Sequence, residues 1–518
     1  MKGILSALTV LVGLLAAIAV PVRLNGQQHT RYKFIDLGTL GGPHSYGSVN
    51  GDGFQLLNNS GVVASLADLA IPDPNSATPI GCYVPDCLQA HAAEWRDGEI
   101  TDLGALPVDN NSAAGSINER GWAAGQSQSS VLDPVLGFPE FHAVLWKQGH
   151  IIDLGTLASG TESLGIYLNN AGQVIGFSTI STEQNDPFGF FGFPTHTFIW
   201  QNGEKLDIGT LGGSDAVPGA SCSNPPEGTI VGGSTTTTTP NPDTGLPTAD
   251  PFLWDHGKMT DLGTLGGTNG FAQCVNHRGQ VIGASSLAAA ACSSGGPGCH
   301  AFFWQDGTMT DLGTLGGDTS EAIWLNEAGE VAGSADLAGP SGNQTHDAVL
   351  WKNGKIHDLG TVLGDPCSRG RGLNARGQVV GGSSDCHNFL HAFVWDEHSG
   401  MVDLNTVIPP GSGFQLTNAF NINDRGEILA KAAPLGFTPN DDEDLGHIVL
   451  LVPCDNGEAD CGIGANVQGR YDPLAATSAL NTATSKSRKR KVSGDTQSTA
   501  WPRQFGQRYI VSAASTKN

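Results

Sequence analysis

Charged residues and long apolar runs are both scarce in this sequence. Only 15% of the 518 residues are charged, and 26 Lys and Arg stand against 50 Asp and Glu. Past residue 20, no stretch keeps apolar residues at helical spacing over ten or more positions. These shortages argue against long helices, and against a folded body that binds nucleic acid or an anionic membrane.

Common catalytic and metal-binding motifs are also missing. The sequence has no Cys-x-x-Cys pair, Gly-x-Ser-x-Gly elbow, phosphate-binding loop, His-Glu-x-x-His or dinucleotide fingerprint. We therefore expect no cofactor and no metal site. The acidic run 440–444 lacks the spacing of a calcium loop, so we interpret it as a solvated turn. An enzyme is not excluded, because catalytic carboxylates that are scattered along the sequence and brought together by the fold leave no local motif.

The two ends of the chain differ from its body. Lys2, the apolar run Ile4 to Val20 and the small residues Ala17-Ile18-Ala19 predict a signal peptide over residues 1–22. A retained membrane anchor is the alternative. Residues 462–518 read as a disordered basic tail, with eight basic residues after position 480 and only Asp495 against them. We expect a secreted or periplasmic protein with no membrane span after cleavage.

Ten cysteines in an exported chain favour disulfides. Their spacing suggests four local pairs, Cys82–Cys87, Cys292–Cys299, Cys367–Cys386 and Cys454–Cys461, which leaves Cys222 and Cys274 for each other. Cys222 and Cys274 each lie two positions before the Asn of a repeat, so we expect their bridge to join neighbouring repeats.

A repeated segment dominates the sequence. Asp-Leu-Gly-Thr-Leu-Gly-Gly stands at residues 36–42, 261–267 and 311–317, and relatives begin at Asp102, Asp153, Asp207, Asp358 and Asp403. Seven segments ending in Trp precede copies of it, such as His300–Trp304, and an Asn turn with a small apolar strand follows, as in Asn326–Gly333. Turns such as Asp306-Gly307 separate these parts, giving four short strands in about 45–50 residues, the size of a propeller blade.

Counting these parts predicts a closed ring. There are eight Asp-Leu-Gly segments and eight following strand pairs, but only seven strands that end in Trp. His447–Pro453 is left over at the far end and can complete the first blade, which lacks its own first strand. We therefore expect an all-β, closed β-propeller of about eight four-stranded blades over residues 32–461. An open solenoid is the alternative.

These motifs are similar to those of the bacterial extracellular HAF repeat family. His-Ala-Phe-x-Trp, Asp-Leu-Gly-Thr-Leu-Gly-Gly and Asn-x-x-Gly-x-Val-x-Gly carry the resemblance, and His300–Trp304 and His391–Trp395 keep the name-giving triplet. The resemblance covers about residues 32–453. It departs at Asp250 and Asp347, which replace His, and in the degenerate stretch Ser223–Gly232. It implies an exported repeat protein and no defined activity.

The repeated residues favour structural roles. Eight copies of one Asp suit a turn that hydrogen-bonds backbone N–H groups better than catalysis, which needs a few distinct groups at one place. The Trp residues suit packing between blades, with an indole N–H to satisfy.

Unrepeated insertions fall at one junction, before each Trp-ending strand, and so should share one face of the ring. They cover residues 66–90, 128–141, 179–195, 234–249, 285–299, 335–346 and 384–390. One insertion carries an aromatic cluster of Phe188, Phe190, Phe191 and Phe193, which could bind a sugar or peptide, or fold onto the propeller.

The sequence therefore predicts a monomeric interaction module that binds an unknown extracellular glycan or protein through one face. A propeller glycosidase or polysaccharide lyase with acidic residues at the channel mouth is the alternative.

Overall fold

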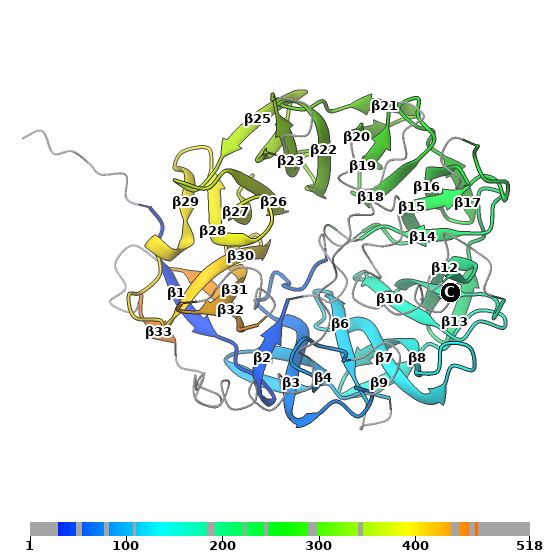
Figure 1. Ribbon diagram of the computed structural model, residues 1–518, viewed down its shortest axis with the longest axis horizontal. Helices are drawn as coiled ribbons and strands as arrows, with labels where there is room; N and C mark the ends of the chain where they lie inside the picture. The colour runs from blue at the N-terminus through cyan, green and yellow to red at the C-terminus, as the bar shows by residue number, and fades with distance from the viewer. Residues whose placement is uncertain are drawn as a thin grey trace, which may run out of the picture.

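The computed structural model describes residues 29–47, 54–76, 82–106, 110–183, 192–220, 222, 225–242, 247–287, 298–339, 345–436, 445–454 and 461–464. They form eight antiparallel blades in a ring (Figure 1), which confirms the predicted all-β propeller. The described residues contain no helix long and apolar enough to cross a membrane. The predicted signal peptide (1–22) lies outside the described residues, as does the predicted tail (462–518) apart from residues 462–464.

Seven blades are consecutive in sequence, with the first strand of each innermost in the ring. Blade 1 has β2 (Gly41–Tyr46), β3 (Val63–Pro72), β4 (Leu88–Arg96) and β5 (Glu99–Asp102). Blade 2 has β6 (Ser112–Ile117), β7 (Ala123–Leu132), β8 (Pro139–Lys147) and β9 (His150–Asp153). Blade 3 has β10 (Ser163–Leu168), β11 (Val174–Thr179), β12 (Thr195–Gln201) and β13 (Glu204–Asp207). Blade 4 has β14 (Ala216–Pro218), β15 (Thr229–Thr235), β16 (Ala249–Asp255) and β17 (Lys258–Asp261).

The remaining three of these blades follow the same order. Blade 5 has β18 (Gly270–Val275), β19 (Val281–Ser286), β20 (Cys299–Gln305) and β21 (Thr308–Asp311). Blade 6 has β22 (Gly316–Leu325), β23 (Val331–Leu337), β24 (His346–Lys352) and β25 (Lys355–Gly360). Blade 7 has β26 (Cys367–Leu373), β27 (Val379–Ser384), β28 (Phe389–Asp396) and β29 (Gly400–Asp403), and the short 3-10 helix η2 (Leu404–Thr406) follows it.

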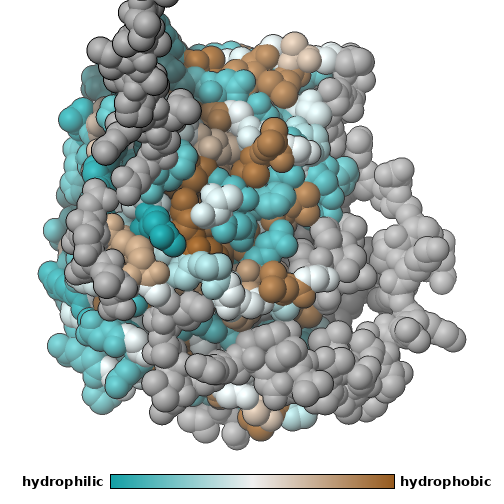
Figure 2. Space-filling view, turned by 90° about the vertical axis from the view of Figure 1, so that its left-hand side faces the viewer, coloured by the Kyte–Doolittle hydropathy of each residue, from teal (hydrophilic) through white to brown (hydrophobic). Residues whose placement is uncertain are grey.

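Blade 8 closes the ring with strands from both ends of the described chain. β30 (Phe414–Ile422), β31 (Ile428–Pro434) and β32 (His447–Pro453) pair in order, and β1 (Tyr32–Asp36) adds outside β32. Phe34 pairs with Leu451 and Asp36 with Val449, which confirms the predicted closure by residues 447–453. A fifth strand, β33 (Ile463–Gly464), pairs parallel with β1, so the folded body extends slightly beyond residue 461. Figure 2 shows this side of the ring, where apolar patches lie between polar residues.

The blades and the sequence repeats are out of phase by two strands. The repeat was divided before each Trp-ending strand, but that strand is the third of its blade, as β20 is in blade 5. Each blade therefore takes two strands from one repeat and two from the next. Blade 8 follows this rule, because three of its strands come from the end of the repeat array and the fourth is β1.

A small residue in each second strand allows the first two strands to approach closely. A Cβ added at Gly125 would lie 2.1 Å from the Ala113 carbonyl oxygen, and one at Gly333 would lie 1.9 Å from that of Glu321. Real side chains cannot tolerate such distances, so the final Gly of the repeated Asn-turn motif is sterically required at these positions.

A belt of asparagine side chains links the blades. Each of six Asn residues donates from Nδ2 to the backbone oxygen of the equivalent Asn in the next blade, at 3.0–3.1 Å. The donors are Asn58, Asn118, Asn276, Asn326, Asn374 and Asn423. The Oδ1 of each also accepts backbone N–H groups of its own turn, as Asn118 does from Arg120 and Trp122. An amide is needed because an ionised Asp could accept but not donate.

The belt crosses the closure of the ring. Asn423 in blade 8 donates to Asn58 in blade 1, and Asn421 of β30 both donates to the Phe54 oxygen and accepts from the Leu56 N–H. Asn224, the residue of blade 4 at the equivalent position, lies outside the described residues. The sequence identified these Asn residues only as turns.

Four disulfides are present among the described residues: Cys82–Cys87, Cys222–Cys274, Cys367–Cys386 and Cys454–Cys461. The pairing agrees with that expected from the spacing. Cys222–Cys274 joins blades 4 and 5 across a Cα–Cα distance of 5.7 Å, as predicted for equivalent positions in neighbouring repeats. Cys299 is buried in β20, and Cys292 lies outside the described residues.

We expect the inter-blade disulfide to contribute strongly to stability. Closing a 52-residue segment removes chain entropy worth up to about 4 kcal/mol from the unfolded state. The double variant Cys222→Ser/Cys274→Ser should therefore lower the free energy of unfolding by up to that amount in denaturant titrations. Cys82→Ser/Cys87→Ser is the matched control, because its five-residue separation predicts only about 2 kcal/mol. Equal losses in the two variants would contradict the entropic account.

Candidate functional site

The long connections of the propeller lie on one side of the ring, which we call the insertion face. In every blade the first and second strands join at an Asn turn on the opposite face. The second strand therefore runs toward the insertion face, where it connects to the third strand. The described parts of the predicted insertions lie at this junction in blades 1–7, and residues 435–436 and 445–446 flank the same junction in blade 8. The face is therefore built from connections that differ from blade to blade.

The repeated Asp residues have the structural role predicted for them. All eight accept a hydrogen bond at Oδ1 from the backbone N–H two residues later, at 2.7–2.9 Å; they are Asp36, Asp102, Asp153, Asp207, Asp261, Asp311, Asp358 and Asp403. Seven of them end a fourth strand, and Asp358 lies two residues before the end of β25; at each position this contact turns the chain toward the next blade.

The sequence did not reveal that five of these Asp residues also pair with the repeated His. The imidazole Nδ1 lies 2.8–3.0 Å from the carboxylate in His91–Asp102, His142–Asp153, His196–Asp207, His300–Asp311 and His447–Asp36. Each pair joins the third strand of a blade to the fourth. The fixed spacing of His and Asp was the available signal, but only the strand register shows that they meet.

The repeated Trp residues pack between blades, as predicted. Trp146 of blade 2 donates its indole N–H to the Gly104 oxygen that follows blade 1, at 3.3 Å, and Trp351 of blade 6 donates to the Leu312 oxygen that follows blade 5, at 2.9 Å. Trp95 donates in the same way to the Leu37 oxygen after β1, across the closure.

Of the predicted aromatic binding cluster, the structure describes only Phe193, and this residue is not exposed. Phe193 has no exposed side-chain area and belongs to the interior of the propeller. Phe188, Phe190 and Phe191 lie outside the described residues, as does the acidic turn 440–444.

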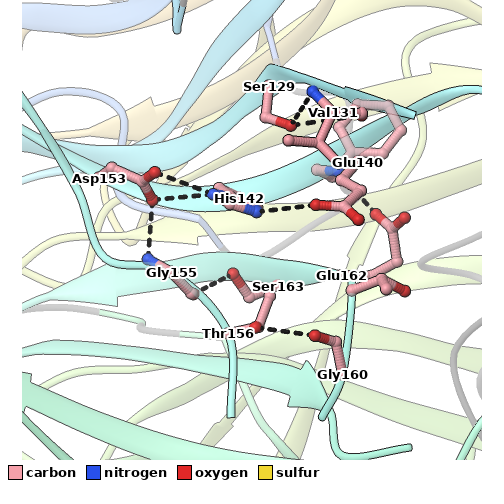
Figure 3. Close-up of polar contacts among 12 residues, drawn as sticks. Ser129, Val131, Glu140, His142, Asp153, Gly155, Thr156, Gly160, Glu162 and Ser163 are labelled. Carbon is pink, nitrogen blue, oxygen red and sulfur yellow. Dashed lines mark hydrogen bonds and ion pairs between the residues drawn. The ribbon is translucent and has the colours of Figure 1, made fainter. Parts of the chain in front are cut away.

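A cluster of unrepeated acidic groups surrounds the repeated His142 between blades 2 and 3 (Figure 3). Beyond its pair with Asp153, His142 directs Nε2 toward the Glu140 carboxylate, 3.5 Å away. Glu162, before β10, accepts the Phe141 N–H at Oε2 at 2.7 Å, and Figure 3 shows Glu140 and Glu162 pointing toward one another. Asp133 accepts two backbone N–H groups nearby.

The surroundings raise the pKa values of Glu162, Glu140 and His142, so these three groups keep their protons to higher pH than usual. Burial, and then the charges of Asp133 and Glu140, raise the pKa of Glu162 well above its usual range. Burial and Asp133 raise the pKa of Glu140, against a lowering by His142. The pKa of His142 is also raised, because its contacts with Asp153 and Glu140 outweigh its burial.

Most of this cluster is out of reach of a substrate. Glu162 and Asp133 are fully buried, and only about an eighth of the Glu140 side chain is exposed. Glu140 is therefore the one raised-pKa carboxyl here that a ligand could contact. Among the described residues no group of three or more His, Cys, Asp or Glu side chains is arranged to hold a metal ion.

Exposed aliphatic side chains concentrate on the insertion face. Of the eight large apolar residues that the described chain exposes, seven lie at the ends of second strands or in connections on that face: Ile71, Val131, Leu132, Val135, Leu287, Leu363 and Leu435. Four of them belong to blades 1 and 2, where β3 and β7 are ten residues long and extend past their neighbours. None of the eight is aromatic.

We call residues 69–76 and 129–139 together the aliphatic surface. Ile71, Val131, Leu132 and Val135 are 46–62% exposed there. The only charged residues in the two segments, Asp73 and Asp133, are buried. In a chain with a net charge of −24, these two segments therefore contribute exposed aliphatic side chains and no exposed charge.

The two halves of the aliphatic surface are held together. Asn75 Nδ2 donates to Gln128 Oε1 at 2.9 Å, which ties the blade 1 connection to β7. Tyr83 stacks on Phe141 with ring centroids 6.0 Å apart, and its hydroxyl accepts from Gln126 at 3.0 Å. The Cys82–Cys87 disulfide lies in the same connection. The surface is therefore a preorganised part of the scaffold.

No known family model matches the chain, and no curated protein matches it. Among solved structures it is similar to the β-propeller domain of the trilobed protease of Pyrococcus furiosus, at 9% identity and a TM-score of 0.36, covering 60% of this chain and 84% of that one. A puromycin-hydrolyzing peptidase of Mycobacterium tuberculosis matches at 11% identity and a TM-score of 0.37, covering 82% of this chain and 55% of that one. A Trypanosoma rangeli sialidase matches at 10% identity and 0.30, covering 82% and 94%. Matches at this level carry no argument about function.

Proposed function

We propose that this protein is an exported binding module that holds a protein ligand on the aliphatic surface of blades 1 and 2. One observation carries the proposal: exposed large apolar side chains gather on the face built from variable connections, whereas the repeated residues are used within the scaffold. Contiguous apolar surface on a soluble protein marks an interaction site. The four disulfides fit an extracellular or periplasmic location.

The chemistry of the surface favours a protein over a glycan. Sugars are bound by aromatic platforms with surrounding polar groups, whereas Ile71, Val131, Leu132 and Val135 offer only aliphatic contacts. A protein partner with an apolar, weakly charged patch would bury these side chains at about 25 cal/mol for each Å² of apolar area. Membership of the HAF repeat family and export through a cleaved signal peptide remain part of this proposal.

Introducing one charge should separate binding from folding. Leu132→Glu places a carboxylate in the uncharged surface, so we expect at least tenfold weaker binding and an unchanged melting temperature, because Leu132 is exposed. Leu206→Glu is the matched control, because Leu206 is similarly exposed but lies on the outer strand β13. Binding can be found by photo-crosslinking from position 132 in the exported protein fraction of the producing cells, with a glycan array in parallel.

Two results would contradict the proposal. One is equal crosslinking from positions 132 and 206, and the other is glycan binding that Leu132→Glu leaves intact.

The enzymatic alternative rests on Glu140, the accessible carboxyl with a raised pKa beside His142. Such a group could donate a proton to a leaving oxygen. Turnover in a panel of glycosidase and lyase substrates, lost in Glu140→Gln and kept in Leu132→Glu, would favour that function over binding.

A further inference from the structure

Two blades break the His–Asp pairing in the same way. In blade 4 the His position is Asp250, and in blade 6 it is Asp347. The strand register is unchanged: Phe252 pairs with Asp261 just as Phe198 pairs with Asp207 in blade 3, where His196 bonds to Asp207. Asp250 is therefore placed against Asp261, and in blade 6 Asp347 is placed against Asp358, where other blades bring an imidazole.

The strand register brings the two carboxyl groups of each pair together, so that the outer one, after burial, raises the pKa of the inner one. A hydrogen bond between two carboxyl groups requires one proton, because an ionised carboxylate can only accept. The outer member already accepts a backbone N–H, from Gly263 at 2.7 Å for Asp261 and from Gly360 at 2.8 Å for Asp358. We therefore assign the shared proton to Asp250 and Asp347, whose pKa values are raised.

The residues that pack against these two carboxyl pairs offer little positive charge to balance a carboxylate. On the second strands the cross-strand neighbours are Ser234 for Asp250 and Ala335 for Asp347, and neither is charged. From the next blade, Asn269 faces the start of β16, and Cys367 and Ser368 face the start of β24. His346 precedes Asp347 on β24, and its cross-strand partner is Asp336, whose carboxyl interacts with its charge.

We propose that blades 4 and 6 carry proton-operated latches: Asp250–Asp261 and Asp347–Asp358 hold the third and fourth strands together while they share a proton, and loosen the outer strand when both carboxyls ionise. Five of the other blades use an imidazole for the same contact and remain latched at neutral pH, whereas His391 of blade 7 bonds to Asp365 instead. The protein would then respond to the acidity of its surroundings through two outer strands, β17 and β25.

The direction of the pH dependence follows from the pKa values of Asp250 and Asp347. Burial, and then the charge of Asp261, raises the pKa of Asp250 to about 6, and burial and Asp358 raise that of Asp347 to about 7. Unfolded Asp titrates near about 4. Between these values the folded protein keeps a proton that the unfolded chain has lost, so stability is full in acid and falls as pH rises from about 4 to about 7.

Three His–Asp blades behave in the opposite way, because the pKa is lowered for Asp102, Asp153 and Asp207. Burial alone would raise the pKa of Asp207, but its contacts with His196 and Gly209 lower it. Such a pair loses stability only when pH falls toward the lowered value. His44 changes stability with pH in the opposite direction to the latches. Burial, and then the charge of Lys431, lower its pKa to about 3, so this group makes the folded protein more stable at neutral pH than in acid. A single melting curve therefore mixes several groups, and the test compares variants and local segments.

The test replaces Asp250 and Asp347 with His, the residue that most blades have at this position. Asp250→His/Asp347→His should convert both latches to His–Asp pairs, and His300→Asp should create a new latch in blade 5. Hydrogen exchange is measured between pH 5 and pH 7.5 in EDTA, corrected for the intrinsic pH dependence of exchange. In the wild type we expect protection of residues 258–261 and 355–360 to fall by up to about tenfold per pH unit. The double variant should lose this fall, and His300→Asp should gain it at residues 308–311.

Two results would overturn the proposal. One is a pH dependence of β17 and β25 that persists unchanged in the double variant. The other is protection of residues 308–311 in His300→Asp that stays constant with pH. Melting temperatures of all three proteins at both pH values show that each variant is folded, so that neither result can arise from a failure to fold.

Discussion

Deleting residues 447–461 is expected to abolish cooperative folding. β32 lies between β31 and β1, and its residues Ile448, Val449 and Leu451 are fully buried. Without it, blade 8 loses its third strand, β1 loses its antiparallel partner, and two unpaired strand edges face solvent. Far-ultraviolet circular dichroism and size-exclusion chromatography should show an unfolded or aggregated product.

Deleting residues 480–518 is the control for this experiment. That segment lies outside the described ring, and we expect its removal to leave the melting temperature unchanged. A protein lacking residues 447–461 that melts cooperatively near the wild-type temperature would contradict a ring closed by β32.

Truncating Trp351 is expected to produce the largest loss among single substitutions at the repeated positions. Its indole is buried, and its N–H donates to the Leu312 oxygen of the preceding blade. Trp351→Ala should lower the free energy of unfolding by about 3–5 kcal/mol, measured in denaturant titrations.

Two further variants test how the indole hydrogen bond and burial between blades contribute to this loss of stability. Trp351→Phe keeps most of the packing but leaves the Leu312 oxygen without its donor, so we expect a loss of about 1–3 kcal/mol. Trp304 is only partly buried, so Trp304→Ala should cost less than Trp351→Ala. If Trp304→Ala were the more damaging of the two, burial between blades would not explain the repeated Trp.

The fold could be predicted because its signals are local and repeated. Turn residues such as Asp306-Gly307 and the eightfold Asp-Leu-Gly segment mark the strands, and the surplus strand at His447 indicates the closure. The phase of the blades could not be read in this way. A repeat can be divided at any of its four strands, and only hydrogen bonding between strands shows that the Trp-ending strand is third.

The site was harder to predict because it depends on contacts between distant residues. Asn58 and Asn423 are 365 positions apart, yet they belong to one belt. The exposed aliphatic residues at the ends of β3 and β7 resemble ordinary strand residues in sequence, and only the extension of these strands exposes them. Phe193 shows the converse, because an aromatic residue in a loop rich in Gly and Pro proved to be buried.

The most direct test of the central claim is hydrogen exchange of the protein alone and with the partner captured by crosslinking from position 132. The account predicts increased protection in residues 69–76 and 129–139, and no change in the Asn turns of the opposite face. Protection confined to the Asn turns, or to the inner strands around the channel, would contradict a binding module that uses its insertion face.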